Sequence, residues 1–155
     1  ILISNLEKNH EDVWIITQNI DGMHQKAESK NIVELHGSAW RLRCDHCKIF
    51  IDDSNPNSYN SWKCENDHWL RPDIVWFNDY LIPAITQKAD EIISQSDLFI
   101  SVGTSGIVWP AAGFPQVARS NGATLIEINP EPSEQSKLYD YVYRGKASDM
   151  LKTIL

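Results

Sequence analysis

The sequence predicts an α/β fold built on a parallel sheet, and the second half of the chain carries the clearest evidence. Residues 97–102 and 123–129 are short apolar runs, rich in β-branched side chains, of the kind that form buried strands. Between them lie a glycine-rich turn, residues 103–106, and a candidate helix, residues 110–120, which Asn121-Gly122 closes. The order strand, turn, helix and strand makes a right-handed crossover between parallel strands.

Further elements are expected before this crossover. Residues 13–19, VWIITQN, form an apolar run that ends in polar residues, as a buried strand does when it delivers side chains to a site. Residues 32–35 and 40–42 are shorter strand candidates. A helix is expected to begin at Pro83, because proline suits the first helical position. Its apolar face consists of Ile85, Ala89, Ile92 and Ile93.

Length and composition exclude several classes of protein. The 155 residues are enough to bury a core without disulfide bonds, and 42% hydrophobic with 23% charged residues excludes the disordered and fibrous classes. The net charge of -7 is unlike that of proteins that bind the phosphate backbone, and no apolar run is long enough to span a bilayer. We therefore expect neither a nucleic acid nor a membrane as partner. The start, ILISNLEKNH, lacks an initiator methionine and a signal-peptide pattern, so residue 1 is not expected to be a natural beginning.

Residues 44–70 differ in composition from the rest of the chain. They are rich in Asp, Asn, Ser and Lys and poor in aliphatic residues, so they cannot build a hydrophobic core of their own. Cys44 and Cys47 are separated by two residues and Cys64 follows, and three cysteines cannot all pair as disulfides. This pattern indicates a small metal-binding module in a reducing compartment, and hence a cytoplasmic protein.

Polar residues follow three of the predicted strands. Ligands of an open parallel sheet bind beyond the carboxyl ends of its strands. Small residues and hydroxyls in GTSG let the backbone approach phosphate oxygens, although an isolated GTSG is also typical of a simple tight turn. His36 lies at another strand end, and on its own it is either a structural histidine or a catalytic one. The polar residues at the three strand ends are Gln18, Asn19 and Asp21, then Gly103, Thr104 and Ser105, and then Asn129 and Glu131.

The motifs ITQNID, ELHGS, CDHC, LRPDIVWF, VGTSGIVWPAA and IEINPEP occur in that order from Ile15 to the closing GKA. In this order they resemble the sirtuins, a family of NAD-dependent protein-lysine deacylases, and most of all the bacterial-type members. The resemblance implies a Rossmann-like parallel sheet that is N-terminally incomplete here. It also implies an NAD-binding domain of residues 1–43 and 71–155, with a zinc-ribbon module, residues 44–70, inserted in it.

The resemblance also implies roles for single residues. His36 matches the general base, which deprotonates a ribose hydroxyl so that it attacks the acyl-imidate intermediate. Asp21 matches the residue that binds the nicotinamide amide, and Asn19 and Gln18 match those that contact the nicotinamide ribose and its water. His36, Asn19 and Asp21 are thus the expected catalytic residues. The expected NAD contacts are Gln18, Asn19, Ile20, Asp21, Gly103, Thr104, Ser105, Asn129, Pro130, Glu131 and Ala147.

The family's zinc ribbon has four cysteines, and this chain has three. Cys44, Cys47 and Cys64 match the family's positions, but Asp67 stands where the fourth cysteine is expected. His68, the next residue, is the better zinc ligand, so either Asp67 or His68 can complete the site. A module that keeps three thiols and holds no metal is the alternative.

Residues 74–79, IVWFND, resemble the family strand that pairs with the substrate peptide, and they also fit a core strand. Asn78-Asp79 replaces the usual Gly-Glu, and Trp76 and Phe77 are expected to wall the tunnel for the lysine methylenes. The carboxylates of Asp73 and Asp79 are expected to attract basic peptides.

The expected function is transfer of an acyl group from lysine to ADP-ribose with release of nicotinamide, so that NAD is consumed and an acyl-lysine protein or peptide is the partner. One alternative is an NAD-cleaving hydrolase or ADP-ribosyltransferase on the same scaffold. A second is a non-catalytic module that binds a nucleotide or a partner. Sirtuins place a first strand and a glycine-rich loop before the region present here. We therefore expect a sheet that lacks a strand from its middle, and no useful activity from these 155 residues alone.

Overall fold

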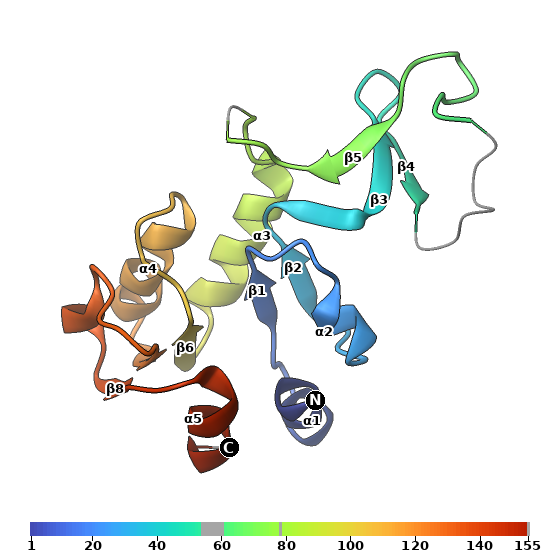
Figure 1. The fold of residues 1–155 in the computed structure, drawn as a ribbon. Coiled ribbons are helices and arrows are strands. Elements are labelled where there is room, and N and C mark those ends of the chain that lie inside the picture. The colour runs from blue at the N-terminus through green and yellow to red at the C-terminus, as the bar shows by residue number, and fades with distance from the viewer. Residues whose placement is uncertain (54–60, 78, 155) are drawn as a thin grey trace.

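The computed structural model describes residues 1–53, 61–77 and 79–154 (Figure 1). The α-helices are α1 Leu2–Asn9, α2 Met23–Lys26, α3 Pro83–Ser94, α4 Phe114–Ser120 and α5 Ala147–Ile154, and the 3-10 helices are η1 Ala111–Gly113 and η2 Ser136–Leu138. The strands are β1 Ile15–Thr17, β2 Ile32–Glu34, β3 Gly37–Cys44, β4 Ile49–Asp52, β5 Arg71–Ile74, β6 Leu98–Val102, β7 Thr124–Ile128 and β8 Tyr141–Tyr143.

Five of the strands are parallel and form two sheets, which confirms the predicted α/β class. β1 pairs with β2, and β7 lies between β6 and β8. Within the ranges that the structure describes, no strand pairing joins the β1–β2 sheet to the β6–β7–β8 sheet. The parallel sheet is therefore interrupted in its middle, as the sequence led us to expect.

One hydrophobic core connects both parallel sheets to α3 and α4. Its buried members include Val33 of β2, Phe114 of α4 and Leu125 of β7, together with Ala89 and Ile93 of α3. In Figure 1, α3 lies between the β1–β2 pair and α4, and it contacts both β2 and α4. The predicted apolar face of α3 is confirmed, because its helical spacing turns these side chains toward that core.

The third sheet is antiparallel, in the order β4-β3-β5, and it carries the small module (Figure 1). The predicted strand at residues 40–42 is part of the longer β3, whose register against β5 shifts between Ser38 and Leu42. β3 therefore begins beside the parallel sheet at Gly37 and ends in the module at Cys44.

The prediction of one helix over residues 110–120 is partly wrong. The segment begins as the 3-10 helix η1 and becomes α-helical only at Phe114. Pro115 has no amide hydrogen and is favoured in the first turn of a helix, so a new α-helix begins there.

The expectation of a strand over residues 74–79 is also wrong for the described part, since β5 ends at Ile74 and Asn78 lies outside the described residues. Val75 N donates to His36 O at 3.0 Å, and Asp79 N donates to Trp76 O at 2.9 Å, which closes a turn.

None of the helices that the structure describes combines the length and the apolar character that crossing a bilayer requires.

Candidate functional site

The polar segment after β1 is anchored to the chain around the start of β3. Asn19 N donates to Thr17 Oγ1 at 3.0 Å, and Ile20 O accepts a hydrogen bond from Ala39 N at 2.9 Å. The indole of Trp40 donates to Asp21 O at 2.8 Å, and Asp21 Oδ1 accepts from the backbone N–H at the start of α2. These bonds fix residues 18–21 at the carboxyl end of β1, where a ligand of the sheet binds.

His36 is brought to the same segment, in the turn between β2 and β3. Its Nδ1 lies 3.0 Å from the carbonyl oxygen of Gln18. Because a carbonyl oxygen only accepts, Nδ1 carries the proton in this contact, and Nε2 is left with a free lone pair. The half-buried imidazole is thus oriented as a base beside residues 18–21.

Gly37, the first residue of β3 and the residue directly after His36, must be a glycine. Its φ is +77°, and a Cβ at this position would lie 1.9 Å from the carbonyl oxygen of Asp73. Glycine therefore lets β3 and β5 approach beside His36, which no other residue permits without a shift of the backbone. This close approach explains the glycine of ELHG.

A second group of polar residues lies at the ends of β6 and β7. Gly103 N donates to Ile128 O at 2.9 Å, and Asn129 Nδ2 donates to Thr104 O at 2.8 Å. Gly103 and Gly106 both have positive φ, so GTSG forms a tight turn with exposed backbone. Gly106 N donates to Thr104 Oγ1 at 3.3 Å and Gly103 N is also engaged, which leaves the N–H groups of Thr104 and Ser105 for a phosphate. The tight turn and a phosphate-binding role are therefore compatible.

The other predicted nucleotide contacts follow these strands. Pro130 and Glu131 are exposed beyond β7, and Ala147 begins α5 after β8. The predicted residues thus fall into two groups, one on the β1–β2 sheet and one on the β6–β7–β8 sheet.

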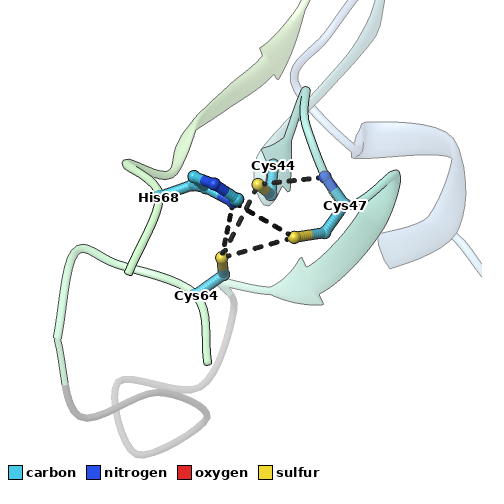
Figure 2. A group of neighbouring side chains, drawn as sticks. All are labelled: Cys44, Cys47, Cys64 and His68. Carbon is cyan, nitrogen blue, oxygen red and sulfur yellow. Dashed lines mark hydrogen bonds between the residues drawn. The ribbon is translucent and has the colours of Figure 1, made fainter. Parts of the chain in front are cut away.

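The predicted metal ligands form the third cluster, which Figure 2 shows. One ligand atom from each of four side chains lies within 4.8 Å of the others, and these side chains are Cys44, Cys47, Cys64 and His68. The Sγ of Cys64 lies 3.7 Å from Cys44 Sγ and 3.6 Å from Cys47 Sγ, and His68 Nδ1 lies 3.3 Å from Cys47 Sγ. A tetrahedral zinc with sulfur at about 2.3 Å has ligand-to-ligand edges of roughly 3.7 Å, so the cluster fits zinc.

Hydrogen bonds prepare the thiols for metal binding. Cys47 N donates to Cys44 Sγ at 3.4 Å, and Asn66 Nδ2 donates to Cys47 Sγ at 3.3 Å. Burial alone would raise the pKa of Cys64, but hydrogen bonds from backbone groups at His68 and Asn66 bring it below the ordinary value. The hydrogen bond from Asn66 lowers the pKa of Cys47, but burial and the neighbouring thiols of Cys64 and Cys44 raise it above the ordinary value. Cys64 therefore ionises more readily than Cys47 to the thiolate, the form that binds metal.

His68, and not Asp67, takes the fourth position of the cluster. Asp67 has φ +62° in a turn in which its N–H donates to Cys64 O at 2.9 Å. The turn directs the Asp67 side chain outward, where it is 83% exposed and bonds Lys63 Nζ at 2.7 Å. The histidine ring also stacks on His46 at 4.5 Å, which restrains its orientation.

The acidic and aromatic residues of β5 and of the segment that follows it do not all lie as expected. Asp73 is buried and pairs with Arg41 and Arg43, while a hydrogen bond from Arg71 at 2.7 Å holds the pKa of Asp79 below its usual range. These pairs neutralise both carboxylates, so they give no support to attraction of a basic peptide. Trp76 and Phe77 are exposed, the latter fully, and are available to contact a substrate.

Trp40 is a site residue that sequence reasoning missed. It was assigned only to a strand, yet its indole bonds Asp21 O and its ring lies against Gly22, where a Cβ would approach it to 2.8 Å. No local pattern marks this role, because it arises from a contact between segments 19 residues apart.

Known proteins similar to this chain belong to one family. The model of the Sir2 family matches residues 1–110. The chain belongs to the Sir2 family. It is 40% identical over 155 residues to an NAD-dependent protein deacylase of Aquifex aeolicus, covering 99% of this chain and 65% of that protein. It is 42% identical over 142 residues to NAD-dependent protein deacylase 2 of Pyrobaculum aerophilum, covering 91% of this chain and 57% of that protein.

Solved Sir2 structures share the fold. A crystal structure of a Sir2 homolog–NAD complex superposes with a TM-score of 0.89 at 34% identity, covering 99% of this chain and 60% of that one. A Sir2–p53 peptide–NAD+ structure gives 0.85 at 27% identity, covering 99% and 66%. The Sir2-family chain thus spans about 60% of the length of these proteins.

Proposed function

We propose that this chain is part of an NAD-dependent protein-lysine deacylase, which transfers the acyl group of a modified lysine to ADP-ribose and releases nicotinamide. The observation that carries the proposal is the contact of His36 Nδ1 with the Gln18 carbonyl, which leaves Nε2 as a base beside residues 18–21. The names of the deacylase relatives and the NAD in two similar structures support the same function.

In this proposal NAD is a substrate and the chain positions its parts. Asp21 and Asn19 hold the nicotinamide end, with Gln18 and Ile20 beside them, and Nε2 of His36 accepts the proton of a ribose hydroxyl. Three sets of residues complete the NAD contacts: Gly103, Thr104 and Ser105 for the phosphates, Asn129, Pro130 and Glu131 for the adenosine ribose, and Ala147 for the adenine.

We further propose that the Cys3His cluster holds one structural zinc ion and that residues 44–70 form a module separate from the NAD-binding domain of residues 1–43 and 71–155. All four cluster positions belong to protein side chains, which is the arrangement of structural rather than catalytic zinc sites. With His68 in the fourth position, the missing fourth cysteine is no argument for a degenerate, non-catalytic module.

The proposed partner is an acyl-lysine protein or peptide, for which Trp76 and Phe77 offer exposed aromatic surface. The three cysteines are free thiols, and thiols that must stay reduced to bind zinc suit a reducing compartment. We therefore propose a cytoplasmic location.

The test is the dependence of nicotinamide release on acyl-lysine. The full-length protein is incubated with NAD, with or without an acetyl-lysine peptide, and nicotinamide and free lysine peptide are quantified. Equal amounts of both products, formed only when peptide is present, are expected. Release of nicotinamide without peptide would identify an NAD hydrolase, and saturable NAD binding without turnover would identify a binding module.

The 155 residues alone are proposed to lack useful activity. In the described part of the chain, β1 and β6 each pair on one side only, so the two groups of NAD contacts lie on sheets that no strand connects. Misplacement of reacting groups by about 1 Å costs on the order of 100-fold in rate. Comparing turnover by residues 1–155 with turnover by the full-length protein tests this, and equal rates would refute it.

A further inference from the structure

Glu127 is a charged residue inside the protein that the proposed reaction does not use. It lies on β7, two residues before Asn129, and only 1% of it is exposed. A buried carboxylate is costly unless hydrogen bonds and an opposite charge compensate it. Its partners therefore indicate what the carboxylate does.

Three side chains compensate the charge, and all come from the segment that follows β7. Ser133 Oγ donates to Glu127 Oε1, and Ser136 Oγ donates to Oε2 at 2.6 Å. Arg144 Nη1 lies 2.8 Å from Oε2. Burial alone would raise the pKa of Glu127, but these hydrogen bonds and the arginine bring it below the ordinary value, so the group is ionised at neutral pH.

Arg144 connects this carboxylate to the backbone of the proposed adenosine contacts. The guanidinium donates to the carbonyl oxygens of Glu131 at 3.1 Å and Asn129 at 3.4 Å, and to Ser136 Oγ at 2.9 Å. The loop of residues 129–136 is therefore folded around one buried ion pair. Five guanidinium donors in a planar fork allow one arginine to hold several acceptors at once.

The same loop holds the GTSG turn. Besides the bond from Asn129 to Thr104, Glu134 N donates to Ser105 O at 3.3 Å. Gln135 Nε2 donates to Gly106 O at 3.0 Å and to Ala112 O at 2.6 Å. A change in the loop is thus transmitted to the turn proposed for the phosphates.

We propose that Glu127 and Arg144 are positioning residues for NAD, which set the geometry of the adenosine and phosphate contacts through the 129–136 loop. This inference rests on the proposed function. Glu127 is too deeply buried to touch the ligand itself, so its influence passes through Arg144, Ser133 and Ser136. The nicotinamide end is held by a different set of bonds, around Trp40 and Gln18, and is independent of this pair.

The test is the effect of Glu127→Gln in the full-length protein on the KM values for NAD and for an acetyl-lysine peptide. The glutamine keeps the size of the side chain and removes its charge. We expect KM for NAD to rise on the order of tenfold, as the loss of one charged hydrogen bond implies, with kcat and the peptide KM changed less than about twofold. A purely structural role would lower the active fraction, and hence kcat, and leave both KM values unchanged.

Asp140→Asn is the matched control. Asp140 pairs with Arg119 at 2.9 Å and accepts from Leu125 N at 2.9 Å, so it too is an acid with an arginine partner, near the other end of β7. The control is expected to lower the melting temperature without raising KM for NAD. Should Glu127→Gln fail to fold, Arg144→Lys replaces it. Arg144 is exposed, so the substitution is tolerated, and lysine keeps the positive charge but loses the planar array of guanidinium donors.

The two proposals fail in different ways. A wild-type protein without saturable dependence on NAD would refute the proposed function. A wild-type protein that saturates with NAD, beside Glu127→Gln and Arg144→Lys variants with unchanged KM for NAD, would overturn the positioning role alone. A rise in KM for NAD in these variants and not in Asp140→Asn is the result we expect.

Discussion

The small module and the α/β region are stabilised by different interactions, although β3 runs through both. The buried cluster of the module consists of Cys44, Cys64 and Leu70 together with Leu42 of the adjoining part of β3, and two of these four residues are cysteines of the proposed zinc site. Among the described residues, the core of the α/β region has nine buried residues from strands, helices and loops, with Leu125 fully buried among them.

This difference implies that the two regions respond differently to loss of one side chain. When one residue of a large apolar core is truncated, the free energy of unfolding falls only by the contribution of that residue, because the remaining contacts persist. A metal site with four ligands is cooperative, since removal of one ligand weakens the binding of the ion that holds all four. Single substitutions in each region therefore test this contrast.

Loss of a zinc ligand should have the largest effect. Cys64→Ser in the full-length protein is expected to abolish zinc binding, which contributes about 10–16 kcal/mol in small zinc domains. Elemental analysis should show close to one zinc per wild-type chain and none in the variant, and limited proteolysis should cleave the variant within residues 44–70. A variant without zinc whose module resists protease would contradict the account.

Loss of the proposed general base should affect the chemistry and leave both regions folded. His36→Ala is expected to lower deacylation by about 10²- to 10⁴-fold, because that is the usual contribution of general-base catalysis. Zinc content, melting temperature and NAD affinity should change little. The assigned role fails if the variant turns over an acyl-lysine peptide at a rate near that of the wild type.

A cavity in the α/β core should destabilise that region without affecting the metal. Leu125→Ala removes a fully buried side chain, and such changes cost about 2–5 kcal/mol. Urea unfolding followed by tryptophan fluorescence and circular dichroism measures the loss, and zinc stoichiometry should stay at one. Release of zinc from the folded variant would show that the two regions are not independent.

The smallest effect is expected for Asp67→Asn, because the side chain is exposed, its ion pair with Lys63 lies at the surface, and asparagine tolerates the positive φ of this position. Zinc content and melting temperature should match the wild type. The neighbouring variant His68→Ala serves as the contrast, since it removes a ligand atom of the cluster and should lower zinc affinity. The reverse result, with zinc lost in Asp67→Asn and kept in His68→Ala, would reassign the fourth ligand.

Features encoded in short segments were predictable from the sequence. The strands near residues 97–102 and 123–129, the start of α3 at Pro83 and the C-x2-C pair follow from periodicity, proline chemistry and ligand spacing. Their determinants lie within a few residues of each other, so a linear pattern contains them.

Features that depend on contacts between distant segments were not predictable. The role of Trp40 depends on a hydrogen bond to Asp21, 19 residues away. The sequence left both Asp67 and His68 open as the fourth ligand. The left-handed conformation of Asp67 in its turn decides for His68. The ion pair of Glu127 and Arg144 joins residues on either side of the 129–136 loop, and neither residue has a pattern that indicates the other.

The contrast between the two regions is tested most directly by amide hydrogen exchange on the wild-type protein before and after removal of zinc with a chelator. We predict that residues of β3, β4 and the 61–70 segment lose protection without zinc, while α3, β6 and β7 keep theirs, because their core does not depend on the metal. Amide protection of the module that persists in the metal-free protein would contradict this prediction. A simultaneous loss of protection in α3 and β7 would also contradict it.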